Sequence, residues 1–146
     1  MAGKKRFPLR EGGFTLIELL TVIGIMGILF GIGIPAIQGY QRRQTLDVST
    51  RQVAADLQWA QSRAMNTGSV YKVTFLQNTN KYEIENEGTN AKVEKILPSK
   101  ITLSSSLDFV RFRPQGTVEV DTIILSISGE WKKVTLNQLG ETNISY

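Results

Sequence analysis

The chain has 146 residues, enough for one small domain besides a membrane segment, and it contains neither cysteine nor histidine. These absences exclude disulfides, cysteine or histidine nucleophiles and the usual zinc ligand sets, so no metal site or cofactor is expected. The formal net charge is +4, but residues 1–13 contribute four cations and one anion, which leaves 13 cations against 12 anions. A generally basic surface is therefore not predicted.

The N-terminal segment joins a basic leader to a long apolar run. Four cations precede Gly13, and residues 19–41 contain no charged side chain. About 20 apolar residues suffice to cross a bilayer. Because cations favour the cytoplasmic side, we expect a cytoplasmic N-terminus and a single-pass protein of the inner (cytoplasmic) membrane, with its C-terminal domain outside the cytoplasm.

Glu18 is the one charged residue inside this apolar segment. The Phe, Leu, Ile and Val residues of 14–37 number 14 and favour insertion by about 4 to 8 kcal/mol. Glu18 opposes insertion by at most about 3 kcal/mol, so the segment is predicted to insert. A carboxylate within a membrane segment is by default a functional-site hypothesis.

Residues 12–20, GGFTLIELL, resemble the N-terminal signature of type IV pilins and type II secretion pseudopilins. The resemblance implies that a prepilin peptidase cleaves between Gly13 and Phe14 and methylates the new amino group of Phe14. It implies that Glu18 serves assembly, that membrane lipid surrounds the helix before assembly, and that other pilins or pseudopilins then bind it in a filament. An ordinary secretory signal cleaved near residues 31–33 is the alternative, but an acid within its core counts against it.

Three residues bear on how this helix packs. Gly27 and Gly31 have the small-xxx-small spacing of closely packed membrane helices, and Pro35 cannot donate a backbone hydrogen bond. We expect close helix packing at the glycines and a kink or melted turn near Pro35. Membrane helices also tolerate glycine and proline in general.

Residues 42–68 are expected to continue the helix with one apolar face. The positions that recur at alternating spacings of four and three are Leu46, Thr50, Val53, Leu57, Ala60 and Ala64. Residues 69–146 change to a period of two and are divided by turn sequences. Strands are predicted at residues 70–75, 82–85, 91–97, 101–103, 109–113, 118–120, 122–128, 131–136 and 143–146.

These patterns predict an α+β fold, in which a long N-terminal helix packs on a small antiparallel β-sandwich or meander. Its helix has a transmembrane half and an amphipathic half. The expected parts are a leader (1–13), a transmembrane spine helix (14–41), an amphipathic half (42–68) and a β-rich globular domain (69–146). The segments 57–68, 112–116 and 134–140 are similar to the minor pseudopilin H and FimT group, where they form the end of the spine helix and glycine-containing hairpins.

Catalysis is not expected, because no nucleophile–base pair, phosphate loop or paired carboxylates can be named. The sequence is interpreted as a minor pseudopilin of a type II secretion pseudopilus, with a structural role in filament assembly and protein export. The alternative is a FimT-like minor type IV pilin of a pilus or DNA-uptake system. In that case a DNA contact is conceivable at Arg111, Arg113, Lys132 and Lys133, although solvent-facing strand residues are the simpler interpretation.

Overall fold

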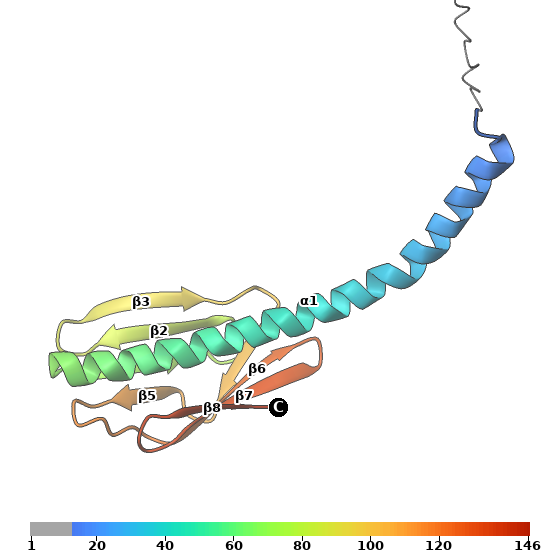
Figure 1. The fold of residues 1–146 in the computed structure, drawn as a ribbon. Coiled ribbons are helices and arrows are strands. Elements are labelled where there is room, and N and C mark those ends of the chain that lie inside the picture. Colours follow the sequence, from blue (N-terminus) through green and yellow to red (C-terminus); the bar gives the residue numbers. More distant parts are fainter. Residues whose placement is uncertain (1–12) are drawn as a thin grey trace, which may run out of the picture. The chain divides into compact units, whose positions relative to one another are not determined.

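The computed structural model describes residues 13–146 (Figure 1). The predicted leader, Gly13 excepted, lies outside the described residues. The chain divides into two compact units, of which the first ends at Gly39 and the second is Tyr40–Tyr146. One helix, α1 (Leu16–Thr67), contributes residues to both units.

In the first unit, α1 has the length and composition of a membrane-crossing helix. Its most apolar 18-residue window has a mean hydropathy of 2.3, and none of that window is buried within the protein. The helix begins at Leu16 because Thr15 caps it, with the Thr15 hydroxyl accepting a hydrogen bond of 3.3 Å from the backbone N–H of Glu18. The backbone stays helical through residue 35, without the melted turn that proline suggested there; a kink at Pro35 stays a prediction.

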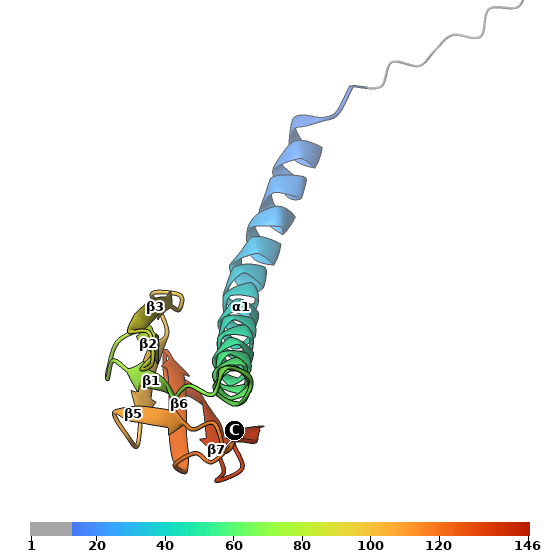
Figure 2. The same cartoon turned by 90° about the vertical axis from the view of Figure 1, so that its left-hand side faces the viewer.

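In the second unit, the predicted helical stripe is confirmed. All six of its residues are buried, with exposed fractions of 0 to 2%. They recur at the period of an α-helix, so they form one face, and that face packs on the β-domain. Figures 1 and 2 show this part of α1 lying along the strands.

Within residues 13–146, eight strands form two four-stranded sheets, and every strand pair there is antiparallel. The first sheet has the order β3-β2-β1-β5 and the second the order β4-β6-β7-β8. The strands are β1 (Tyr71–Phe75), β2 (Lys81–Asn86), β3 (Ala91–Ile96), β4 (Thr102–Ser105), β5 (Phe109–Phe112), β6 (Asp121–Ile127), β7 (Glu130–Leu136) and β8 (Thr142–Ser145). The chain passes between the sheets from β3 to β4, from β4 to β5 and from β5 to β6.

One predicted strand is wrong. Residues 118–120 are not a strand, although their sequence alternates. They belong to the connection from β5 in one sheet to β6 in the other, so they cannot join either ladder along their length. Val118 is nevertheless buried, and its N–H donates to the carbonyl of Gln138 at 3.3 Å. Of the two valines that gave the alternating pattern, only Val118 is buried, and Val120 is exposed.

The core lies between the helix stripe and the inner faces of both sheets. It is one cluster of 22 buried apolar residues, six of them from α1. On β1, Tyr71, Val73 and Phe75 point inward, as period-two alternation requires. The α+β fold of a long helix packed on two antiparallel sheets is therefore confirmed.

Candidate functional site

The bond expected to be cleaved lies just before the helix. Gly13 and Phe14 are both exposed and precede the first residue of α1. Phe14 exposes 86% of its surface. Residues 13–15 are outside the helix and exposed, so this side of the bond is accessible to a peptidase. Cleavage itself stays a prediction.

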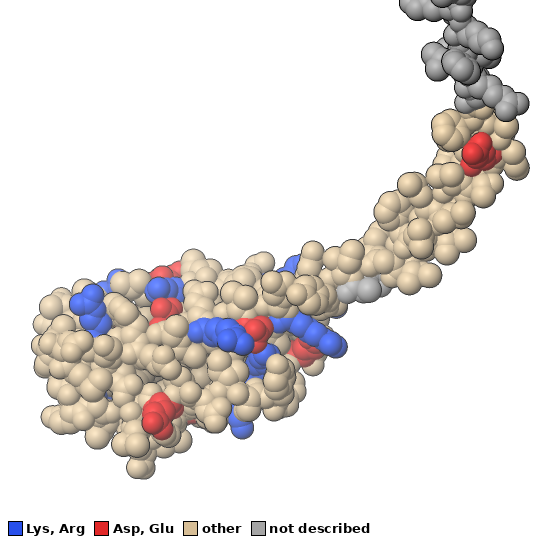
Figure 3. Space-filling model, in the orientation of Figure 1, with Lys and Arg blue, Asp and Glu red and all other residues tan. Residues whose placement is uncertain are grey.

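Glu18 is exposed in the first turn of α1. It is the one charged residue between 13 and 39, which Figure 3 shows as an otherwise uncharged segment. No residue of 13–146 forms an ion pair with it. The unpaired N–H groups of a first helical turn favour a nearby anion. That local effect does not replace a cation, so the carboxylate can still bind a positively charged partner.

The glycines predicted to permit helix packing are open to their surroundings. A Cβ atom at Gly27 or at Gly31 would meet nothing within 4 Å among the described residues. No contact among the described residues therefore requires glycine at either position. A second helix approaching this face remains the reason we predict for them.

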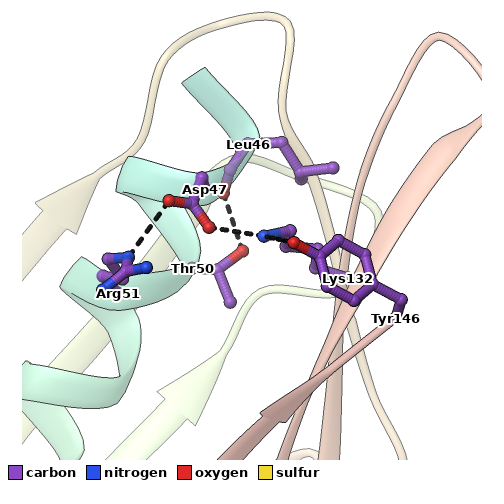
Figure 4. Close-up of polar contacts among 6 residues, drawn as sticks. All are labelled: Leu46, Asp47, Thr50, Arg51, Lys132 and Tyr146. Carbon is purple, nitrogen blue, oxygen red and sulfur yellow. Dashed lines mark hydrogen bonds and ion pairs between the residues drawn. The ribbon is translucent and has the colours of Figure 1, made fainter. Parts of the chain in front are cut away.

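A buried lysine connects α1 to β7 (Figure 4). The Lys132 ammonium donates to the carboxylate of Asp47 on α1 and, at 3.1 Å, to the hydroxyl of Tyr146. Asp47 also accepts from Arg51 at 3.1 Å. The hydrogen bonds from Lys132 and then Arg51 lower the pKa of the Asp47 carboxyl, and the bond to Asp47 raises the pKa of Lys132. The pair fixes the second sheet against the helix.

A tyrosine connects α1 to the first sheet. The buried Tyr82 of β2 donates its hydroxyl proton to Asp56 of α1 at 2.6 Å, and Lys95 of β3 lies 3.5 Å from the same carboxylate. Burial, followed by the hydrogen bond to Asp56, raises the pKa of Tyr82 far above its usual value. Two carboxylates of α1 therefore bind one sheet each: Asp47 binds the second sheet and Asp56 binds the first.

Two glutamines bind the start of β8 and the turn that precedes it. Gln58 donates to the Thr142 hydroxyl at 2.8 Å, and Gln61 donates to the Leu139 carbonyl at 2.6 Å. They stand three residues apart and therefore share one helix face. Gln61 lies so close to Gly140 that a Cβ there would come within 2.1 Å of its side-chain nitrogen.

The four cations named for a conceivable DNA contact come from two different sheets, since β5 and β7 do not share one. Arg111 lies in β5 and pairs with Glu87 at 2.9 Å, and Arg113 directly follows β5 and pairs with Glu119 at 3.8 Å. Lys132 is buried on the core side of β7, so it cannot contact DNA.

Lys133 projects from the opposite face of β7, because successive strand residues point to opposite faces. The second sheet holds β7, whereas β5 lies in the first. The burial of Lys132 removes it from the conceivable DNA contact, and a contact at Arg111, Arg113 and Lys133 stays a proposal.

The sequence interpretation missed Asp121, which is 1% exposed. It accepts hydrogen bonds from the hydroxyls of Ser105 and Ser106 at 2.6 and 2.5 Å, and from two backbone N–H groups. The alternation of side chains along a strand could have shown that Asp121 points inward, since it shares its strand face with the buried residues of β6.

Comparison with known proteins fits this arrangement. Residues 49–140 match the family described as "Type II transport protein GspH", and residues 9–34 match the "Prokaryotic N-terminal methylation motif". Over 37 residues the chain is 60% identical to "Prepilin peptidase-dependent protein D" of Escherichia coli (strain K12). This match spans 25% of the chain and 25% of that relative's length.

Two kinds of solved structure share the fold. The minor pseudopilin EpsH from the type 2 secretion system of Vibrio cholerae is 14% identical, with a TM-score of 0.59 over 68% of this chain and 95% of that one. The type IV minor pilin FimU of Pseudomonas aeruginosa is 15% identical, with a TM-score of 0.60 over 73% of this chain and 92% of that one.

A long helix with an apolar first unit, joined to a two-sheet domain, defines a pilin-like subunit. Within that class, the match covers well over half of the 146 residues. The chain belongs to the GspH family of type II transport proteins.

Proposed function

We propose that this chain is a minor subunit of a type II secretion pseudopilus, with a structural role in filament assembly and protein export. The precursor is anchored in the inner membrane by the apolar part of α1, with residues 40–146 outside the cytoplasm. A prepilin peptidase removes residues 1–13 and methylates Phe14. The subunit then leaves the membrane and enters the filament through its N-terminal helix.

The observation that carries the proposal is the carboxylate of Glu18, which has no ion-pair partner among residues 13–146, in an apolar helix attached to a GspH-type domain. Alone in an apolar environment, that charge is costly. Cleavage would create an amino group on Phe14, and methylation keeps the group basic. When helices stack with an axial offset, the amino group of one subunit reaches the carboxylate of its neighbour.

This pairing would neutralise both charges and fix the register between subunits, a role for which buried polar groups are well suited. Lipid would cover the exposed apolar side chains of the first unit in the membrane-anchored precursor. In the filament, the same side chains of neighbouring subunits would cover one another. The action is mechanical and architectural. No step requires a bond to be made or broken by this chain.

The test is to replace Glu18 by Gln, which keeps the size and removes the charge. We expect Glu18→Gln to be inserted and cleaved normally, because insertion is favourable without the acid, but to be lost from filaments isolated by shearing. The matched control is Thr21→Ala, which removes a side-chain bond of 2.8 Å to the Ile17 carbonyl in the same turn. If Glu18→Gln enters filaments and supports export as well as this control, the pairing is wrong.

The likeness to the FimU fold supports a second candidate, a minor type IV pilin of a pilus or DNA-uptake system. A DNA-binding subunit would shift duplex DNA in a gel at physiological salt. Charge reversal of Arg111 and Arg113 would abolish that shift. Under the secretion proposal, the same double variant exports protein normally and the wild-type domain leaves DNA unshifted. Neighbouring genes for a secretion ATPase and secretin would also favour secretion over pilus retraction.

A further inference from the structure

A groove of about 920 Å³ opens between α1 and the β6–β7 hairpin, within the unit Tyr40–Tyr146. Three aromatic side chains line it, Tyr40, Trp131 and Tyr146, and we name it the aromatic groove. They expose 68, 51 and 86% of their surfaces, and they are three of the four highly exposed aromatic residues between 40 and 146. Large apolar groups gathered at one exposed site indicate a surface that something covers.

Polar contacts hold the walls of the aromatic groove in place. Arg43 of α1 binds Glu130, at the start of β7, with 3.0 Å between Nε and Oε1. Lys132 binds Asp47 of α1, and its ammonium lies 4.3 Å from the centre of the Tyr146 ring. These contacts join the two walls of the groove and hold the Tyr146 ring, so little ordering of the walls is needed when a partner binds.

The position of the aromatic groove along the chain limits what can cover it. Tyr40 follows the apolar run, whose last large aliphatic residue is Ile37. Three residues span at most about 11 Å even when fully extended. This limit holds for any angle between the two units. If the first unit spans a membrane, as the proposed function requires, Tyr40 lies at the boundary between lipid and water.

The chemistry of the aromatic groove suits that boundary. Tyrosine and tryptophan are enriched at membrane interfaces because one part of each ring is apolar and another forms hydrogen bonds. The charged residues that line the groove are three cations, Arg43, Arg51 and Lys132, and two anions, Asp47 and Glu130, a net charge of +1. Arg42 precedes Arg43 in the chain and adds a further cation. Such an excess attracts anionic lipid.

The geometry points to the aromatic groove as a contact for phospholipid headgroups of the membrane that holds α1, with anionic phospholipid preferred. Trp131, at the hairpin that faces Arg43, enters the headgroup region. The soluble domain is thus held against the membrane surface before it enters a filament. This inference rests on the proposed membrane anchoring and adds a second lipid contact outside the spanning helix.

The chain has two tryptophans, and the second supplies a matched control. Trp59 is 45% exposed, close to the value for Trp131, and packs edge-on to Tyr71 with 6.0 Å between ring centres. It lies 19 residues beyond Tyr40 on α1, roughly 28 Å along the helix. Trp59→Phe leaves Trp131 as the only tryptophan, and Trp131→Phe leaves Trp59, so excitation at the red edge of the tryptophan band reports on one residue in each variant.

Each full-length variant is reconstituted at less than one chain per vesicle into phosphatidylglycerol and phosphatidylcholine vesicles. The vesicles carry lipids brominated near the headgroup, which quench nearby tryptophan. We expect at least about twofold quenching of Trp131, as for an interfacial aromatic residue, and none of Trp59. Arg42→Gln with Arg43→Gln, or vesicles of phosphatidylcholine alone, should weaken the quenching of Trp131.

Flotation of the vesicles separates the two claims. If the chain floats with the vesicles and Trp131 is not quenched, the headgroup contact is wrong and the membrane-anchored proposal stands. If the chain does not float, anchoring fails and the contact fails with it. If Trp131 becomes shielded from aqueous iodide only at many chains per vesicle, the groove binds a second copy, which also overturns the lipid contact. Equal quenching in both lipid mixtures contradicts the preference for anionic lipid.

Discussion

The Lys132 ammonium on β7 lies against the Asp47 carboxylate on α1, although the two residues are 85 positions apart in sequence (Figure 4). Lys132 exposes only 9% of its side chain, whereas Asp47 exposes 36%. A lysine in this setting needs its partner, because an unpaired buried charge is strongly unfavourable. The ion pair therefore fixes which part of the helix faces the second sheet.

The coupling between these residues should depend on pH. Asp47 has a lowered pKa, so its contribution to stability is present above the carboxyl pKa of the unfolded chain, about 3.9, and is lost as pH falls. Lys132 has a raised pKa, so its contribution persists below about 10.4 and is lost above. A double-mutant cycle of Asp47→Asn and Lys132→Met, by urea unfolding of residues 40–146, should give a coupling that is constant from about pH 5 to 9.

The same cycle should show a coupling that shrinks below about pH 4. A parallel cycle with Arg51→Gln in place of Lys132→Met is the control, since the Arg51 side chain is 72% exposed and exposed pairs contribute little. Undiminished coupling between Asp47 and Lys132 at pH 3 would mean that it does not arise from the charged pair.

Leu57 should be a principal packing residue. It is 1% exposed in the centre of the helix stripe, and replacing a buried leucine by alanine costs about 2 to 5 kcal/mol. Urea unfolding of residues 40–146 should show this loss for Leu57→Ala. Val48→Ala, at a helix position with 58% exposure, should change the free energy of unfolding by less than about 0.5 kcal/mol. Equal effects at the two positions would place the core elsewhere.

Gly140 should be intolerant of alanine for two separable reasons. Its φ is +77°, which costs a residue with a Cβ about 1 kcal/mol, and the new Cβ would collide with Gln61. Gly140→Ala should therefore cost more in the wild type than in a Gln61→Ala background, where the backbone cost remains. Gly129 is the control, because it has a φ of +88° but no neighbour within 4 Å of a Cβ. Its alanine variant should show no coupling to Gln61.

Much of the fold follows from local periodicity. The buried stripe of α1 and the alternating strands were predictable because each element repeats its apolar residues with its own geometric period. Residues 118–120 were not, since alternation in three residues cannot distinguish a strand from a connection between sheets. The partition of strands into two sheets was also out of reach, because β4 lies between two strands of the first sheet in sequence yet pairs with β6 of the second.

The polar contacts were less predictable than the packing. Lys132 looked like a surface cation because a charged residue on a strand is usually solvated, and its acceptor Asp47 is far away in sequence. Asp121 was detectable in principle by its inward register on β6, but its donors come from the distant segment 105–107. Such groups are paired by tertiary structure, which local pattern does not encode.

The proposed function depends most on cleavage between Gly13 and Phe14 and on methylation of Phe14. Mass spectrometry of the intact protein and of its N-terminal peptide, isolated from its own cells, measures both directly. The account predicts loss of residues 1–13 and one added methyl group on the amino group of Phe14. In cells lacking prepilin peptidase, the mass should be that of the full chain. A mature protein that begins near Ile34, or an intact leader in cells with active peptidase, would contradict the account.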